Sequence, residues 1–288
     1  MAIAESLPAR PPSTGLRFVR RNPTLVIGAL VLLALVLIAL AAPFLVTHDH
    51  VRISPRTRLR PPSLEHWFGT DHLGRDLYSR VVYGTRVSLQ VGSVVALLAT
   101  GLGLAIGLIC GFVRHVDNVV MRVMDGIMAV PGILLAFALV ALTRPGLVTV
   151  IAAITIPEVP RVTRLVRSVV LSLREFVYVE AARTVGTRPV RLLLRHILPN
   201  AVAPLVVQAS YVFASAVITE AILSFLGAGI PPEIPSWGNI VAEGRERIFI
   251  AFHIVAFPGL FLTITVLAVN LMGDGLRDSL DPRMRRRL

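Results

Sequence analysis

Long uncharged apolar blocks alternate with short arginine-rich segments along this chain. A helix needs about 20 apolar residues to cross a hydrocarbon core of about 30 Å. Blocks of this kind predict spans near residues 25–46, 87–113, 119–143, 201–226 and 248–273. Since every backbone polar group must be paired inside a bilayer, these blocks indicate an all-α polytopic membrane protein.

The stretch 145–157 is harder to interpret. As a helix it would rise only about 20 Å, which is short of the hydrocarbon thickness. It is either the start of a helix that continues into polar residues beyond Pro160 or a re-entrant piece. We count it as a span. The resulting six spans form a transmembrane domain over 24–273 and place both termini on one side of the membrane.

Composition supports this interpretation. The chain is 55% hydrophobic and only 16% charged, and its formal net charge is +12. All 29 basic residues are Arg, so a Walker A phosphate loop, which needs a lysine, is excluded. We expect no nucleic-acid partner, because arginines beside membrane spans set orientation. In the six-span arrangement 19 arginines lie on the side of the termini and 10 on the other, which predicts cytoplasmic tails over 1–23 and 274–288.

The longest cytoplasmic connection contains an ordered, basic segment over 176–200. Its second half carries a single apolar helical stripe, formed by Val190, Leu193, Leu194, Ile197 and Leu198. Gly186 suits a left-handed helix C-cap, Thr187 could cap the next helix, and Pro189 is tolerated in a first turn. The segment therefore predicts a helix, a glycine turn and a second helix. An amphipathic helix lying on the bilayer surface is the alternative.

This segment resembles the "EAA" motif of ABC importer permeases. The residues that carry the resemblance are Glu180, Ala181, Ala182, Gly186, Ile197, Leu198 and Pro199. In that family the motif is the coupling helix region, which docks in a groove on the ATP-binding subunit. One position departs from the general pattern, because His196 stands where the family commonly has Ile. RHILPN is similar to the peptide-type subgroup.

Three further stretches resemble dipeptide, oligopeptide and nickel permease subunits, in the expected order. They are GTDHLGRDLYSRVVYGTRVSL from residue 69, LSFLGAGIPPEIPSWGNIVAEGR from residue 223 and GDGLRDSLDPR from residue 273. The resemblance covers about residues 20–283. It implies a type I ABC importer permease fold, with about six transmembrane helices and a cytoplasmic coupling helix.

The resemblance also implies a function and partners. The chain would be a non-enzymatic permease subunit in the bacterial inner membrane, translocating short peptides delivered by an extracytoplasmic binding protein. It would pair with a second permease subunit and two ATP-binding subunits, which would hold ATP and magnesium, so this chain would need no cofactor. A nickel or other small-solute importer is the alternative within the family. An intramembrane protease and a non-transporting scaffold are alternatives from other classes.

Several residues invite sharper hypotheses. Asp125 and Glu220 are acids in apolar runs, for which we expect pairing with Arg or a buried hydroxyl rather than proteolytic or proton-coupling chemistry. Trp237 could be an interfacial anchor or part of an extracytoplasmic gate. Small residues permit close helix contact, and Gly103, Gly107 and Gly111 recur on one helix face, which we expect to pack inside this subunit.

The outside loop 47–86 is rich in histidine. It contains His48, His50, His66 and His72. Their spacings are irregular and no acid–histidine ligand pattern is evident, so the sequence predicts no metal site here. We expect Asp71, Arg75 and Asp76 to order the loop or to contact a binding protein.

Overall fold

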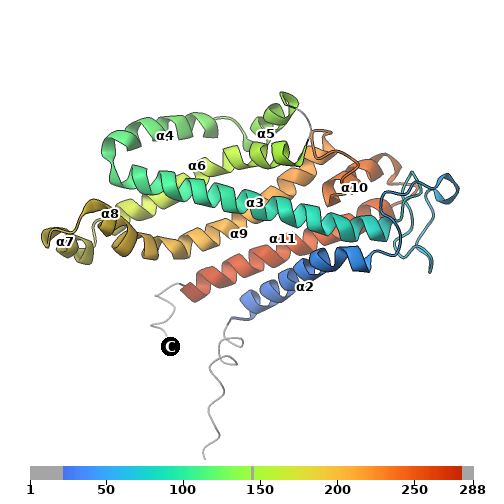
Figure 1. Ribbon diagram of the computed structural model, residues 1–288, viewed down its shortest axis with the longest axis horizontal. Coiled ribbons are helices and arrows are strands. Elements are labelled where there is room, and N and C mark those ends of the chain that lie inside the picture. The colour runs from blue at the N-terminus through green and yellow to red at the C-terminus, as the bar shows by residue number, and fades with distance from the viewer. Residues whose placement is uncertain (1–21, 144–145, 281–288) are drawn as a thin grey trace, which may run out of the picture.

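The computed structural model describes residues 22–143 and 146–280, and within these ranges the regular structure is helical (Figure 1). The long helices are α2 (Pro23–Leu45), α3 (Leu77–Phe112), α6 (Leu147–Leu173), α9 (Leu198–Phe225) and α11 (His253–Leu280). The shorter helices are α4 (Arg114–Met128), α5 (Gly132–Ala141), α7 (Val177–Thr184), α8 (Pro189–Leu192) and α10 (Trp237–Gly244). Single turns occur at η1 (Pro55–Thr57), η2 (Leu193–Ile197) and η3 (Arg245–Arg247).

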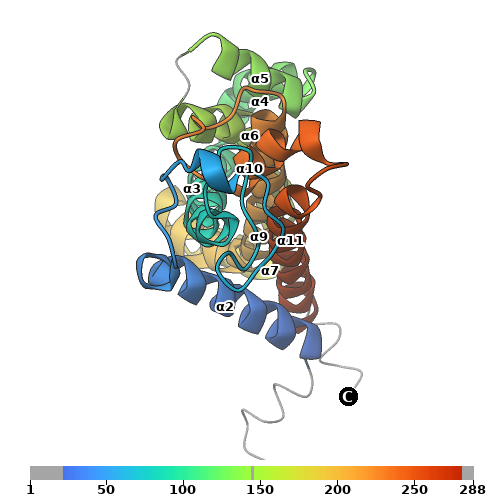
Figure 2. The same cartoon turned by 90° about the vertical axis from the view of Figure 1, so that its right-hand side faces the viewer.

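The long helices form an elongated bundle in layers. Helices α3 and α9 lie in the middle, α2 and α11 pair along one side, and α6 with α4 and α5 covers the other (Figures 1 and 2). Helices α7 and α8 lie at one end of the bundle, and the 46–76 loop and α10 lie at the opposite end (Figure 1). The start of α2 and the end of α11 point toward the α7 end. The predicted tails over 1–23 and 274–288 lie mostly outside the described residues.

Four helical runs in the described part of the chain are long and apolar enough to cross a membrane. They are Pro23–Leu45, Leu77–Phe112, Pro189–Phe225 and His253–Ser279. A fifth is obtained if α4 and α5, which are bent by 83° at their junction, count as one span. The expectation of a single span over 119–143 is therefore corrected to a bent pair. Pro131 explains the break, since a proline disfavours helical backbone at the residue before it.

Helix α6 resolves the difficult stretch 145–157. It begins at Leu147 and continues through Pro157 and Pro160 to Leu173, so the first of the two alternatives is correct. Its 27 residues rise about 40 Å, which is enough to cross a bilayer. Its arginines keep it from standing out as an apolar block. In the described residues α6 lies along the bundle beside the four apolar runs and the bent pair, although it is too polar to count among the apolar spans itself.

Helix α3 begins ten residues before the predicted span at 87. The Asp76 side chain is its N-cap and accepts a hydrogen bond from the Ser79 backbone N–H at 2.8 Å. The first turns carry Arg80, which is buried and paired rather than solvated. A search for uncharged blocks cannot find such a start, because it treats every arginine as a boundary.

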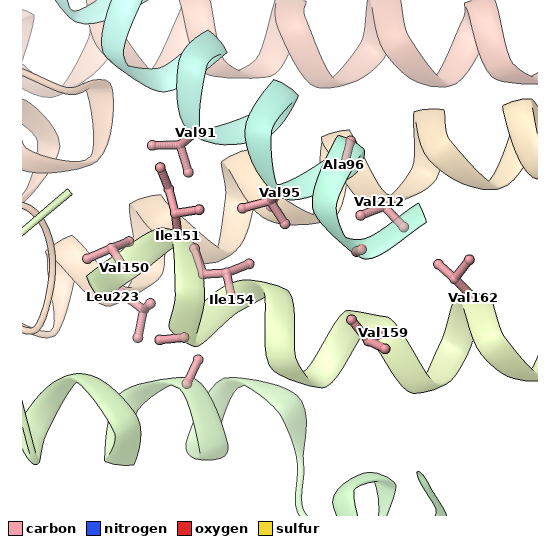
Figure 3. Packing of buried hydrophobic residues seen from close by; sticks show 14 of the residues in the cluster. Val91, Val95, Ala96, Val150, Ile151, Ile154, Val159, Val162, Val212 and Leu223 are labelled. Carbon is pink, nitrogen blue, oxygen red and sulfur yellow. The ribbon is translucent and has the colours of Figure 1, made fainter. Parts of the chain in front are cut away.

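The main core lies between α3, α6 and α9, where small and β-branched side chains interdigitate (Figure 3). The three glycines of α3 meet valines of α6. A Cβ added to Gly107 would lie 2.7 Å from the Val166 Cβ, and added Cβ atoms at Gly103 and Gly111 would meet Val162 and Val170 equally closely. The expectation that this face packs inside the subunit is confirmed.

Candidate functional site

The segment 176–200, called the coupling segment below, forms a compact hairpin at the α7 end of the bundle (Figure 1). Helix α7 ends at Thr184, and Gly186, the residue after its C-cap Val185, has a φ of 81° in the left-handed region. The Gly186 N–H donates to the Arg183 carbonyl at 2.9 Å, and the Thr187 N–H donates to the Ala182 carbonyl at 3.1 Å. This pair of bonds is a Schellman C-cap, so the predicted glycine cap is confirmed.

The second half of the coupling segment differs from the prediction in two ways. Arg188, not Thr187, precedes α8, and no side-chain bond caps that helix. The predicted apolar stripe is also only partly buried: Ile197 is fully buried, whereas Val190 is 67% exposed. The cause is the π-helical turn η2, whose extra residue rotates the following side chains out of the 3.6-residue register. Leu192, outside the predicted stripe, is buried instead.

The exposed side of this segment is apolar with a basic rim. A shallow groove there is lined by Arg188, Val190, Arg191, Leu194, Arg195 and Pro199. Val177, the first residue of α7, is 80% exposed, and Val185, its C-cap residue, is 87% exposed. Glu180 and Ala181 are exposed beside them, and no ion pair holds the Glu180 carboxylate within the described ranges. Exposed apolar patches rimmed by polar residues are typical of interaction sites.

The seven residues that carry the family resemblance are thus brought into one hairpin but do not share one exposed face. Glu180, Ala181, Gly186 and Pro199 are exposed, Ala182 and Leu198 are half-buried, and Ile197 is buried under the π turn. The buried member packs into the core between α3, α6 and α9. The segment is therefore fixed to the bundle from inside while its outer side stays open.

The opposite end of the bundle is held by a buried charge network. The Arg80 guanidinium lies 2.6 Å from both the Asp71 and the Glu243 carboxylates, and Arg75 contacts the same two acids at 2.6 and 2.5 Å. Burial would raise the pKa of Asp71, but Arg80 and Arg75 outweigh it and hold that pKa below its ordinary value. The expected ordering role of Asp71 and Arg75 is confirmed. Sequence reasoning missed Arg80 and Glu243.

The two acids in apolar runs are paired as expected. Asp125 accepts a hydrogen bond from Arg164 at 2.8 Å, and Glu220 accepts bonds from Ser224 and Ser236 at 2.9 and 2.8 Å. Their partners lie on different elements, and the two acids form no facing dyad. The geometry therefore offers no aspartyl protease site at these two residues.

Trp237 is fully buried, and its indole N–H donates to the Val81 carbonyl at 3.2 Å. It fixes α10 against α3 and is not an exposed interfacial anchor.

A polar site that the sequence did not reveal lies where α5, α6 and α9 meet. There Glu158 accepts hydrogen bonds from Arg161 at 2.9 Å and Ser215 at 3.0 Å, beside a cavity of about 350 Å³. The Glu–x–x–Arg spacing on one helix was the available signal.

Sequence comparison places the chain among transport permeases. Residues 103–286 match the family described as binding-protein-dependent transport system inner membrane component. Residues 15–62 match the N-terminal transmembrane domain of oligopeptide transport permease C.

Curated relatives match nearly the whole chain. A probable peptide ABC transporter permease protein of Sinorhizobium fredii is 53% identical, with 95% of this chain and 94% of the relative covered. A dipeptide transport system permease protein of Alkalihalophilus pseudofirmus is 43% identical, with 92% and 88% covered. A glutathione transport system permease protein of Pectobacterium atrosepticum is 42% identical, with 93% and 90% covered.

The fold has a solved counterpart. An inward-facing structure of the MetNI methionine ABC transporter superposes with a TM-score of 0.59 at 22% identity, covering 71% of this chain and 98% of that one. At this identity the likeness concerns the fold alone, and it agrees with the expected type I importer architecture. The chain belongs to the family of binding-protein-dependent transport system inner membrane components, the multi-pass permease subunits of ABC importers.

Proposed function

We propose that this permease subunit carries short peptides across the bacterial inner membrane. Relatives named for peptide, dipeptide and glutathione transport support this substrate class over nickel. An extracytoplasmic binding protein delivers the peptide, and a second, homologous permease subunit completes the path through the lipid bilayer. Two ATP-binding subunits hold ATP and magnesium, and they supply the hydrolysis for which this lysine-free chain has no Walker A loop.

The observation that carries the proposal is the open outer side of the coupling segment. Its exposed apolar groove and basic rim suit a docked protein surface, while Leu192 and Ile197 fasten it to the bundle from within. We assign the contact with the ATPase to Glu180, Ala181 and Gly186 on the α7 side and to Pro199 on the α9 side. Ala182, Ile197 and Leu198 support that surface from beneath.

The helical continuity of the segment explains how docking moves the bundle. Residues Pro189–Phe225 form one helical run of 37 residues, which is about 55 Å long. A displacement at α8 therefore reaches the far end of α9, next to α10 and the outside loop. Nucleotide binding switches access only if it favours one of two bundle arrangements over the other.

Orientation follows from the same segment. ATP is cytoplasmic, so the α7 end must face the cytoplasm, and the start of α2 and the end of α11 point the same way. The excess of arginine on this side, 19 against 10, agrees with the positive-inside rule. Both termini are then cytoplasmic.

Substitution of Gly186 tests the coupling role. A left-handed residue other than glycine costs about 1–2 kcal/mol, so Gly186→Val should displace the hairpin, although open space surrounds its Cβ position. Gly227→Val is the matched control, because Gly227 has a φ of 83°, caps α9 in the same way and also has open space around it, but lies at the opposite end. Glu180→Lys tests the charge of the docking surface.

All three variants should insert and pair with the second permease subunit. Gly186→Val and Glu180→Lys should lose capture of the ATPase subunits from detergent and should lose solute-stimulated ATP hydrolysis. Gly227→Val should keep ATPase capture. If the first two variants bind the ATPases and stimulate hydrolysis normally, the segment is an amphipathic surface hairpin, and the proposal is refuted.

A further inference from the structure

Three potential metal ligands converge at the end of the bundle opposite the coupling segment. The Asp76 Oδ1 atom lies 2.9 Å from the His66 Nδ1 atom and 3.9 Å from the His48 Nδ1 atom. The two imidazole rings are tilted by 38° to each other, with centroids 4.8 Å apart. No spacing pattern in the sequence reveals this group, because 28 positions separate His48 from Asp76. The loop brings them together by folding back on the first turn of α3.

The charge of Asp76 is the unusual feature of this cluster. Its side chain is 1% exposed, and its Oδ2 atom is occupied by the Ser79 N–H at 2.8 Å and the Ser79 hydroxyl at 2.6 Å. The Oδ1 atom faces the two imidazoles. Within the described ranges no arginine pairs with Asp76. The His66 ring is hydrogen-bonded to the Oδ1 atom at 2.9 Å, and a cation bound among these groups would pair directly with a buried carboxylate, which proteins normally match with a positive partner.

A neighbouring cluster with similar ligand types shows the contrast. Asp71, His72 and Glu243 also lie close enough together to share an ion. There, however, Arg75 and Arg80 contact both acids and already balance their charge. A divalent cation would be repelled from that cluster, whereas the group around Asp76 has room for positive charge.

The separations suit a tetrahedral ion. Zinc–nitrogen and zinc–oxygen distances of about 2.0–2.2 Å place neighbouring ligand atoms about 3.3–3.6 Å apart in a tetrahedron. The separations of the two histidine Nδ1 atoms from Asp76 Oδ1, 2.9 and 3.9 Å, lie on either side of that range. The ligands are held in place by the backbone. The His48 N–H donates to the Ser79 hydroxyl and the His66 N–H donates to the Ser63 hydroxyl, both at 3.1 Å.

A hollow of about 430 Å³ adjoins the cluster and leaves room for a further ligand. Besides His48, His66 and Asp76, its lining includes two acids, Asp49 and Glu65, and one cation, Arg52. A water molecule in this hollow could therefore fill the fourth position.

We propose that His48, His66 and Asp76 form a binding site for a divalent transition-metal ion that imidazole favours, with Zn²⁺ as the reference ion. The ion neutralises the buried Asp76 carboxylate and cross-links the loop that follows α2 to the first turn of α3. The site lies at the end of the bundle where a binding protein would dock, and it takes no part in ATP hydrolysis.

The test uses the full chain purified in detergent with its partner permease. Zn²⁺ is titrated by calorimetry against wild type, His48→Ala and His72→Ala, with Mg²⁺ as a second titrant. His48 is the ligand to remove because its side chain is 41% exposed and its loss leaves the N-cap of α3 intact. His72 lies in the same loop and belongs to the arginine-filled cluster, so it is the matched control. Thermal melting without metal verifies that each variant folds.

Wild type and His72→Ala should bind one Zn²⁺ with equal affinity and should not bind Mg²⁺. His48→Ala should bind Zn²⁺ about tenfold more weakly or worse, since even second-shell substitutions have effects of that size. Substituted Co²⁺ should give the absorption of a tetrahedral site. The proposal is overturned if wild type binds no Zn²⁺, if His48→Ala binds it as tightly as wild type, or if His72→Ala loses it.

Discussion

Replacing Arg80 with methionine should destabilise the outer end of the bundle strongly. The buried network holds two acids, Asp71 and Glu243, and two arginines, Arg75 and Arg80, so its formal charge is zero. Arg80 is 1% exposed and donates to both acids. A methionine side chain at this position would fill most of the volume but leave a net negative charge. Breaking a buried pair in this way costs about 3–5 kcal/mol.

An exposed pair of the same chemistry provides the control. Arg164 and Asp125 are joined at 2.8 Å, but their side chains are 50% and 57% exposed. Arg164→Met should therefore cost less than about 1 kcal/mol. Thermal melting in detergent, followed by the fluorescence of the two tryptophans, compares the variants. Adding Glu243→Gln to Arg80→Met should recover part of the loss, because it removes the surplus negative charge.

The stability of the folded protein should fall at acidic pH. The pKa of Asp71 is lowered in the folded protein from a usual value of 3.8, so its contribution to stability is complete at neutral pH. That contribution is lost as the pH falls from about 3.8 through the lower folded pKa. Arg80→Met should reduce this loss of stability on acidification.

The assignment of the network is refuted if Arg80→Met and Arg164→Met melt alike, or if Glu243→Gln lowers the stability of Arg80→Met further.

Other predictions concern packing, docking and orientation. Gly107→Val should destabilise the bundle by about 1–3 kcal/mol in the same melting assay, because its added Cβ would meet Val166 at 2.7 Å; an unchanged melt would contradict the helix contact. Leu192 is 1% exposed, so Leu192→Asp should abolish ATPase capture, whereas Arg191→Ala should change capture by no more than about fivefold. If the two variants reduced capture to a similar extent, the assigned burial of Leu192 would be wrong. A cysteine at position 279 should react with an impermeant thiol reagent only in permeabilised cells, and labelling from outside would reject the orientation.

The apolar spacing was sufficient for the long helices but not for their ends. Blocks near 25–46 and 201–226 correspond to α2 and α9 within a few residues. The start of α3 was placed late because the uncharged block begins only after Arg86, so the first turns of the helix, which contain buried Arg80, fell outside it. The bend at Pro131 was missed because it lies inside an uncharged block, residues 126–143, and apolar character alone does not show where a helix changes direction.

At the coupling segment, local chemistry was predictable and register was not. Glycine in a left-handed cap follows from the absence of a Cβ, so Gly186 could be assigned from sequence. The π turn depends on packing against the bundle, which no 3.6-residue pattern encodes, and so the burial of Leu192 was missed. Contacts between distant segments, such as Arg80 with Glu243 or His48 with Asp76, had no sequence signal at all.

Uptake of a labelled peptide into proteoliposomes is the decisive measurement for the transport function. The chain is reconstituted with its second permease subunit, the two ATP-binding subunits and the binding protein, and a radiolabelled dipeptide is added on the binding-protein side. We predict uptake by the wild-type complex that requires both ATP on the ATPase side and the binding protein, and that is lost with Gly186→Val. ATP hydrolysis by the wild-type complex without entry of labelled peptide would contradict the claim that this subunit imports peptides.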